Sequence, residues 1–537
     1  MTLTDKMKAW EPAAVWSEAG EGMFTVPAKA FRGVAERLKA EGFDFLRSLT
    51  GMDWGEEGFG VVYHLEATST GENVVVRTLT PERERPVLPS VCDLWKAAEL
   101  NEREAFDYFG IRFLNHPDMR RLYLRDDWVG HPLRKDYDPA SNPLRMSNEV
   151  SKDSAPSFEL TSDGSFIRKR NVLFEEDEYV INVGPQHPAT HGVLRFRVSL
   201  EGEIIKKLDV HCGYIHRGIE KLCEGLTYPQ TLALTDRLDY LGAAQNRHAL
   251  CMCIEKGLGV EVSERVQYIR TIMDELQRID SHLLFFACLC MDMGALTAFF
   301  YGFRDREKVL DILEQTTGGR LIQTYNTIGG VQADIHPEFV RKVKEFIAYM
   351  RPVLREYHEI FTGNVIAQER LKGTGVLTRE DAISFGATGG TGRAAGWACD
   401  VRKRHPYAVY GKVDFEEVLF TEGDCLARYM VRMREIEQSM HIIEQLIDNI
   451  PEGEYQLKMK PVIRIPEGSY YAAVEGSRGE FGVFIESRGD KFPYRMKFRS
   501  TGLPLVSCLE TIARGTKIAD LIAIGGTLDY VVPDIDR

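Results

Sequence analysis

Residues 264–291 read ERVQYIRTIMDELQRIDSHLLFFACLCM, and their apolar side chains recur with the spacing of an α-helix. Residues 231–258 and 337–361 carry the same helical pattern. The most apolar part is 283–291, which ends at Asp292, whereas a membrane-spanning helix needs about 20 mostly apolar residues. The pattern predicts a buried helix of a helix-rich domain, and any membrane contact is expected through partner proteins.

The same domain also contains strand signals, so its expected class is α+β. Residues 203–208 are strand-like, and 219–224 are helical in pattern. Residues 470–475 and 480–485 are joined by Gly476-Ser477-Arg478-Gly479, which predicts a β-hairpin. We expect this domain to span residues 179–537.

A smaller α+β domain is expected before it, over residues 1–137. The predicted elements are a helix, the two strands of a hairpin, a second helix and a turn-rich segment, over residues 28–40, 61–69, 73–80, 90–109 and 115–136. Gly42 is a plausible stop for the first helix. Residues 138–178 form the predicted linker, because they are rich in Ser, Asn, Asp and Pro without a sustained period. Both an irregular connector and an ordered strap on the second domain fit that composition.

Composition narrows the class of partner. The formal net charge is −13, which argues against nucleic acid as the main partner, since phosphate backbones are bound by basic surfaces. Residues 1–26 have neither the apolar core of a signal peptide nor a membrane anchor. The ten cysteines include no CxxC pair, so we expect buried thiols in a reducing compartment and no metal held by this chain.

Two histidines, His187 and His191, lie four residues apart in the segment GPQHPATHGVLRF, residues 184–196. Its Pro and Gly residues predict a loop, in which the imidazoles could donate a proton or bind a carbonyl oxygen. The alternative is a pair of structural histidines that cap a turn.

Positive charge follows at His216 and Arg217, in the segment HCGYIHRGIEK. Both residues could lie near an electron carrier on a neighbouring protein and favour its reduced form. The alternative is a salt-bridged loop, because Glu220 and Lys221 are close in sequence. Gly213 and Gly218 would allow close backbone approach.

Tyr240 ends the segment Asp236-Arg237-Leu-Asp239-Tyr240, which is predicted to open an amphipathic helix. The tyrosine is either a buried hydrogen-bond donor or a packed aromatic. Asp292 lies among apolar residues, and a buried carboxylate needs a partner, for which a histidine is suitable. Alternatively, Asp292 caps the helix after Gly294.

Taken in order, these motifs resemble a known family. Residues 179–537 are similar to the D, or 49-kilodalton-type, subunit of respiratory complex I, and residues 1–137 to its C, or 30-kilodalton-type, subunit. The D-like motifs are GPQHPATHGVLRF, HRGIEKL, DRLDY, MDMGALTAFF, GDCLARY, GEFGV and ADLIAIGGT. The C-like motifs are EREAFDYFGI, NHPDMRR and GHPLRKD. The chain therefore resembles a C/D fusion, with a second domain like the large subunit of nickel–iron hydrogenases.

The resemblance implies roles for individual residues. His191 matches a histidine at the quinone headgroup, Tyr240 a tyrosine that binds the other part of the headgroup, and Asp292 the acid that pairs with the histidine. Arg217, with His216, matches a position near the terminal [4Fe-4S] cluster of the B subunit. Further quinone-site contacts are expected from His187, and from Arg237, which is expected on the same helix turn as Tyr240.

The resemblance also implies an assembly. The chain would bind no cofactor itself, would take a quinone as substrate, and would work far from the NADH site of another subunit. The expected partners are the B, I, H, A and G subunits of a proton-pumping complex on the cytoplasmic side of the bacterial inner membrane. Ubiquinone-type members carry a histidine where this chain has Ile322. This departure favours a lower-potential quinone such as menaquinone.

Two other functions fit the sequence less well. A hydrogenase large subunit needs two CxxC pairs, but the matching segments, 237–241 and 527–530, contain no cysteine. A non-catalytic scaffold would have no physical need for a buried carboxylate directed at a histidine. Both alternatives are disfavoured by the residues present.

Overall fold

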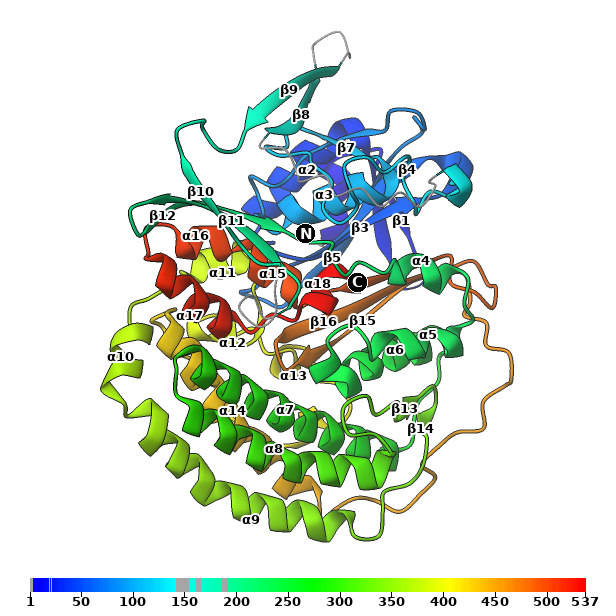
Figure 1. Ribbon diagram of the computed structural model, residues 1–537. Helices are drawn as coiled ribbons and strands as arrows, with labels where there is room; N and C mark the ends of the chain where they lie inside the picture. Colours follow the sequence, from blue (N-terminus) through cyan, green and yellow to red (C-terminus); the bar gives the residue numbers. More distant parts are fainter. Residues whose placement is uncertain (1–2, 19, 21, 142–153, 161–165, 186–191) are drawn as a thin grey trace.

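The structure is a computed structural model of the chain. It describes all residues except 1–2, 19, 21, 142–153, 161–165 and 186–191 (Figure 1). For residues 154–160 and 166–172 only the backbone is described. The expected α+β class with a small first domain and a helix-rich second one is confirmed (Figure 1).

The first domain is built on a five-stranded sheet in the order β1-β2-β5-β4-β3. The strands are β1 (Val15–Ser17), β2 (Met23–Pro27), β3 (Phe45–Asp53), β4 (Phe59–Glu66) and β5 (Asn73–Thr80). Strands β2 and β5 run parallel, and the other neighbours are antiparallel. The predicted hairpin corresponds to β4 and β5, and the predicted first helix to α2 (Ala28–Ala40).

The seam between the domains runs along β3 and β4, in which every residue is buried. Helix α3 (Ala98–Phe109) lies against β3, and the Phe31 ring of α2 stacks on Tyr63 of β4 at 4.6 Å between centroids. A second apolar cluster joins Met52 and Trp54 to Tyr471 and Phe484 of the second domain. Strand β3 was not predicted, because a strand covered on both faces shows no alternation of apolar and polar residues.

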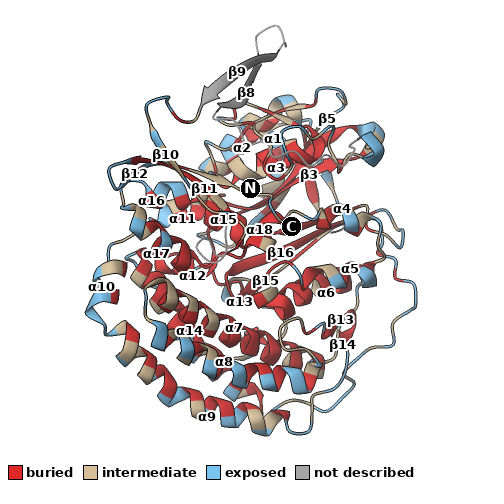
Figure 2. Cartoon of the chain, in the orientation of Figure 1, coloured by how far each residue is buried: buried red, intermediate tan, exposed pale blue. Residues whose placement is uncertain are grey.

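The second domain is centred on α7 (Glu264–Asp292), which packs between α8 and α14 (Figures 1 and 2). Ser263 starts α7, because its Oγ accepts a hydrogen bond from the Val266 backbone N–H at 3.2 Å. A three-stranded antiparallel sheet, β15-β16-β17, lies against α6. The elements are α6 (Ala243–Leu258), α8 (Leu296–Thr317), α9 (Phe339–Tyr357), α14 (Cys425–Leu446), β15 (Gly468–Gly476), β16 (Gly479–Ser487) and β17 (Arg495–Arg499).

Shorter elements complete the two domains. The strands are β6 (Val87–Pro89), β7 (Arg112–Leu114), β10 (Tyr179–Val183), β11 (Arg195–Glu201), β12 (Ile204–His211), β13 (Asn326–Thr327) and β14 (Gly330–Val331). The helices are α1 (Leu3–Trp10), α4 (Ile219–Glu224), α5 (Tyr228–Thr235), α10 (Val365–Leu371), α11 (Arg379–Phe385), α12 (Gly389–Ala394), α13 (Val401–Arg404), α15 (Gly502–Ser507), α16 (Leu509–Ala513), α17 (Ile518–Leu528) and α18 (Val532–Asp536). A π-helical turn, His358–Thr362, extends α9.

The segment predicted as a linker contains regular structure. Strands β8 (Ser154–Leu160) and β9 (Phe166–Val172) pair as an antiparallel hairpin, and β8 runs close to β7 of the first domain. The end of the segment lies on the second domain, where Arg197 covers the Phe174 ring and Lys207 pairs with Glu178. The boundaries at 137/138 and 178/179 stay predictions.

Two predicted helices are shorter than expected. The helix expected over 90–109 begins at Ala98, because Glu102 accepts hydrogen bonds from the Ser90 hydroxyl (2.6 Å) and the Val91 backbone N–H (2.8 Å) and holds a turn there. The helix expected over 231–258 is interrupted between α5 and α6.

Within the described residues, the helices include none with the length and hydropathy that a membrane crossing requires.

Candidate functional site

Tyr240 begins a short 3-10 turn, Tyr240–Gly242, in the link between α5 and α6. The side chain of Asp239 caps this turn, since its Oδ1 accepts a hydrogen bond from the Leu241 backbone N–H at 3.1 Å. Asn246 donates from Nδ2 to the Asp239 carbonyl at 3.0 Å. These bonds break the helix predicted here. Tyr240 is half-buried, and burial raises the pKa of its phenol above the ordinary value.

Arg478 joins the Tyr240 turn to the far end of the sequence. Its guanidinium donates to both oxygens of Asp239, at 2.9 and 3.2 Å, and to Asp529 Oδ1 at 3.3 Å. Asp529 follows α17 with φ +60°, and Arg432 Nε lies 3.4 Å from its second oxygen. The segments 237–241 and 527–530 therefore meet around one buried cation.

Asp292 is the last residue of α7 and is half-buried, so the expectation that it is buried among apolar neighbours is wrong. Its alternative role as an N-cap is also wrong, because Ala295 precedes α8. Burial and then the charges of Asp529 and Asp292 raise the pKa of Cys288, one turn before Asp292, to about 11. The turn that begins at Tyr240 packs against α7, the helix that ends at Asp292.

The two loop histidines, His187 and His191, lie outside the described residues. The loop that contains them connects β10 to β11, and its described end at Gly192 packs tightly on α18. A Cβ at Gly192 would lie 2.4 Å from Val532 Cγ2, and its φ is +143°, so this position needs glycine. The assignment of both histidines stays a prediction.

The loop that carries His216 is fixed to the C-terminus. Asp536 accepts hydrogen bonds from the backbone N–H groups of Gly213 (2.8 Å) and Ile215 (3.0 Å), and the His216 ring bonds the Asp536 carbonyl at 2.5 Å. The expected close approach at Gly213 is present, since a Cβ there would lie 2.2 Å from the Tyr123 carbonyl. His216 also stacks on Tyr123 of the first domain, with 5.4 Å between ring centroids.

Arg217 and Arg237 are both exposed and adjacent, with Arg217 donating to the Arg237 carbonyl at 2.7 Å. Partial burial and then the charge of Arg237 lower the pKa of Arg217. The salt-bridged alternative is wrong, because Glu220 is buried against Arg495 at 2.7 Å and Lys221 pairs with Glu224. Arg237 was expected on the same helical turn as Tyr240. This expectation is wrong, because Arg237 lies in the link after α5.

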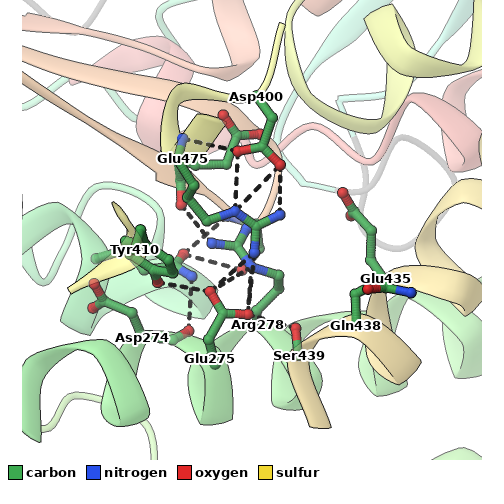
Figure 3. A network of polar contacts seen from close by, with 12 residues as sticks. Asp274, Glu275, Arg278, Asp400, Tyr410, Glu435, Gln438, Ser439 and Glu475 are labelled. Carbon is green, nitrogen blue, oxygen red and sulfur yellow. Dashed lines mark hydrogen bonds and ion pairs between the residues drawn. The ribbon is translucent and has the colours of Figure 1, made fainter. Parts of the chain in front are cut away.

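A second set of buried charges lies around the middle of α7 (Figure 3). Arg402 binds Glu275 at 3.0 Å and Asp400 at 2.6 Å, while Glu275 also accepts hydrogen bonds from the Tyr410 and Ser439 hydroxyls, each at 2.6 Å. Burial opposes ionisation of Glu275, but Arg278 and Arg402 outweigh it and lower its pKa to about 2. This network joins α7 to α13, α14 and the sheet.

A cavity of about 720 Å³ lies between the domains, lined by Arg47 and His64 of the first and by His248, Lys256 and Tyr407 of the second. None of the predicted site residues that the structure describes lines it.

Cys92, Glu102 and His116 come together in a geometry that could suit a metal. His116 does not fit that role, because Nδ1 accepts from the Asp118 N–H (2.9 Å) and Nε2 contacts the Glu99 carbonyl (3.0 Å).

Known proteins give this geometry its context. The family model of the respiratory-chain NADH dehydrogenase 30 Kd subunit matches residues 24–143, and that of the 49 Kd subunit matches 292–463 and 457–537. The NADH-quinone oxidoreductase C/D subunit of Phocaeicola vulgatus is 79% identical over 513 residues, which cover 95% of this chain and 99% of the relative. The chain belongs to the family of NADH-quinone oxidoreductase C/D subunits. The resemblance seen in its motifs is thereby confirmed.

Other relatives of the C/D family agree. The C/D subunit of Bacteroides thetaiotaomicron is 70% identical over 528 residues, covering 96% of this chain and all of the relative. The NADH-quinone oxidoreductase D subunit of Geobacillus kaustophilus is 43% identical over 366 residues, which are 68% of this chain and all of that relative. The C/D family makes this chain one subunit of a respiratory NADH-quinone oxidoreductase with several subunits.

The residues of this site that the sequence did not single out include Arg478 and Asp529. In the sequence, Arg478 was considered only as part of the turn of a predicted hairpin. Asp529 was considered only because its segment, 527–530, contains no cysteine. An arginine in a hairpin turn is usually exposed to solvent, so the sequence carries no signal that Arg478 is buried and paired.

Proposed function

We propose that this chain forms the quinone-reduction site of its complex together with the B subunit, and that electrons reach the quinone from the terminal [4Fe-4S] cluster of that protein. The observation that carries the proposal is the half-buried Tyr240, held in a capped turn that packs against α7, the helix that ends at Asp292. Arg217 and His216, on the clamped loop, would face the cluster. The chain itself would hold no redox centre.

The chemistry follows from what a quinone becomes on reduction. Two electrons make its oxygens strongly basic, so two proton donors are needed. Tyr240 stays neutral at rest, because burial raises its pKa, yet it can protonate a quinol dianion. His191, paired with Asp292, would be the second donor, with His187 and Arg237 as further contacts.

The wider assembly belongs to the same proposal. The B, I, H, A and G subunits would surround the chain on the cytoplasmic side of the bacterial inner membrane, NADH would be oxidised at a distant protein of the complex, and quinone reduction would drive proton translocation. Ile322 supports menaquinone as the substrate, and finding ubiquinone as the host's sole quinone would contradict that choice.

A hydrogenase-like activity is disfavoured by the charges at the homologous segments. Where two cysteine pairs would bind metals, Asp239 and Asp529 both bind the guanidinium of Arg478. A buried cation between these segments repels a divalent metal, and four thiolates are missing. A nickel assay of the purified protein tests the hydrogenase-like activity, and the fold relationship to that enzyme class remains part of the proposal.

The deciding experiment is Tyr240→Phe in the assembled membrane complex. Removing one hydroxyl should lower the quinone-reductase kcat by about 100-fold, the effect of losing a general acid, while assembly is kept. Tyr268→Phe is the matched control, since Tyr268 is also half-buried but lies roughly 36 Å from Asp292 along α7. A wild-type rate in Tyr240→Phe would reduce this chain to structural support.

A further inference from the structure

The turn that carries Arg478 is held rigidly between β15 and β16. Gln245 Oε1 accepts hydrogen bonds from the Ser477 backbone N–H at 2.9 Å and from its hydroxyl at 3.0 Å. Gly389 packs against the Arg478 carbonyl so closely that a Cβ there would lie 2.3 Å from the oxygen. Arg478 itself is 1% exposed. Its guanidinium therefore has one fixed position inside the second domain.

From that position Arg478 reaches three separate segments. It binds Asp239, which caps the Tyr240 turn, and Asp529, which follows α17. It also donates to the Ser281 hydroxyl of α7 at 3.0 Å. A planar guanidinium can serve several acceptors at fixed angles, which an ammonium group cannot do. The orientation of the Tyr240 turn is thus set by one side chain.

The charges that face Tyr240 are unequal in sign. Burial opposes ionisation of the phenol, Arg478 favours it, and the carboxylates of Asp239 and Asp529 oppose it. With Arg478 absent, Asp239 would lose its guanidinium partner, and Arg432 would be left to balance Asp529 alone. A phenolate formed at Tyr240 would then be repelled in a partly buried site, where charges interact strongly.

We propose that Arg478 is a positioning residue for proton transfer from Tyr240: it orients the Tyr240 turn through Asp239 and stabilises the phenolate that remains after the proton leaves. This inference rests on the proposed function. In the step, the O–H bond of Tyr240 breaks, and an O–H bond forms on the oxygen of a quinone already reduced by the partner's iron–sulfur cluster. The negative charge moves to Tyr240, and water later returns a proton.

A double-mutant cycle in the assembled complex tests the proposal. Arg478→Gln should lower kcat by about 100-fold, as the loss of one preorganised stabilising group does, with KM changed less than about threefold. Arg478→Lys keeps the charge but loses the planar fork, so it should recover only part of that loss. Because Arg478 acts through Tyr240, Arg478→Gln should cause no further loss of kcat on the Tyr240→Phe background.

The outcomes separate the inference from the function on which it rests. If Tyr240→Phe lowers kcat but the two losses multiply in the double variant, Arg478 does not act through Tyr240 and the inference is overturned. If Tyr240→Phe alone has no effect, the proposed function fails instead. Should Arg478→Gln prevent assembly, the same cycle with Arg478→Lys decides. Arg393→Lys, at an equally buried arginine that pairs with Glu475, is the control and should show no coupling to Tyr240.

Discussion

The middle of α7 and its C-terminal end both gather charged side chains, but the two regions are balanced in different ways. In the middle, Glu275 is fully buried and receives two guanidinium groups and two hydroxyl groups (Figure 3). At the end, Cys288 and Asp292 are half-buried, and the neighbouring cation, Arg478, is already shared by two other carboxylates. The charges in the middle of α7 are thus enclosed by other side chains, whereas the C-terminal end of α7 is partly exposed to solvent.

This difference indicates which charges hold the fold and which are available for chemistry. A buried carboxylate with several donors is fixed in the ionised state, as the low pKa of Glu275 indicates. A half-buried phenol with a raised pKa keeps its proton and can still release it to a stronger base. Variants of the two regions should therefore fail differently, the first by unfolding and the second by slow turnover.

The largest effect on stability is expected from Arg402→Met. This change leaves Asp400 and Glu275 buried without the guanidinium that binds both, which should reduce the free energy of unfolding by about 3–5 kcal/mol. Urea denaturation of the full chain measures it. Arg355→Met, at an exposed position of α9, should stay within about 0.5 kcal/mol of wild type. A similarly small change in Arg402→Met would show that the network does not stabilise the fold.

The pKa of Glu102 is shifted in the opposite direction to that of Glu275, because burial of its carboxyl group outweighs the hydrogen bonds that it accepts. Glu102 is fully buried, and burial raises its pKa to about 8 even though Ser90 and Val91 donate to it. The folded chain therefore binds a proton that the unfolded chain releases above its ordinary pKa near 4.5. The contribution of Glu102 to the free energy of unfolding should be largest below pH 4.5. It should fall by about 1.4 kcal/mol per pH unit between that pH and pH 8.

Glu102→Gln isolates this contribution, since the amide is neutral at every pH. Urea denaturation at pH 5.5 and 7.5 should show a fall in wild-type stability that the variant lacks. If both proteins lose the same amount, another group is responsible for the pH dependence.

Much of the fold could be predicted from local sequence patterns. Helix α4 and the strand pair β15–β16 were located because apolar spacing and turn residues act over short distances. The C/D resemblance was carried by contiguous motifs in the same way. Predictions failed where a distant or single side chain overrode the local pattern, as Asp239 does in breaking the helix expected over 231–258.

The site was predicted only in part, for a related reason. Tyr240 and Asp292 stood out by residue type and motif, and the fold packs the Tyr240 turn against the helix that ends at Asp292. The bond from Arg478 to Asp239 spans 239 positions in the sequence, and no short-range pattern reports such a contact. The same holds for Asp536, which fixes the His216 loop from the opposite end of the domain.

The smallest expected effect comes from the exposed charges beside the partly exposed end of α7. Arg217→Gln removes one positive charge from an exposed loop whose backbone is held by Asp536, so the fold should not change. If Arg217 faces the cluster of the B subunit, the midpoint potential of that cluster should fall, on the order of tens of millivolts at low salt and less at high salt. Redox titration of the assembled complex by electron paramagnetic resonance measures the shift. Arg217→Lys keeps the charge and should leave the potential near the wild-type value, whereas identical potentials in all three proteins would place Arg217 beyond the reach of the cluster.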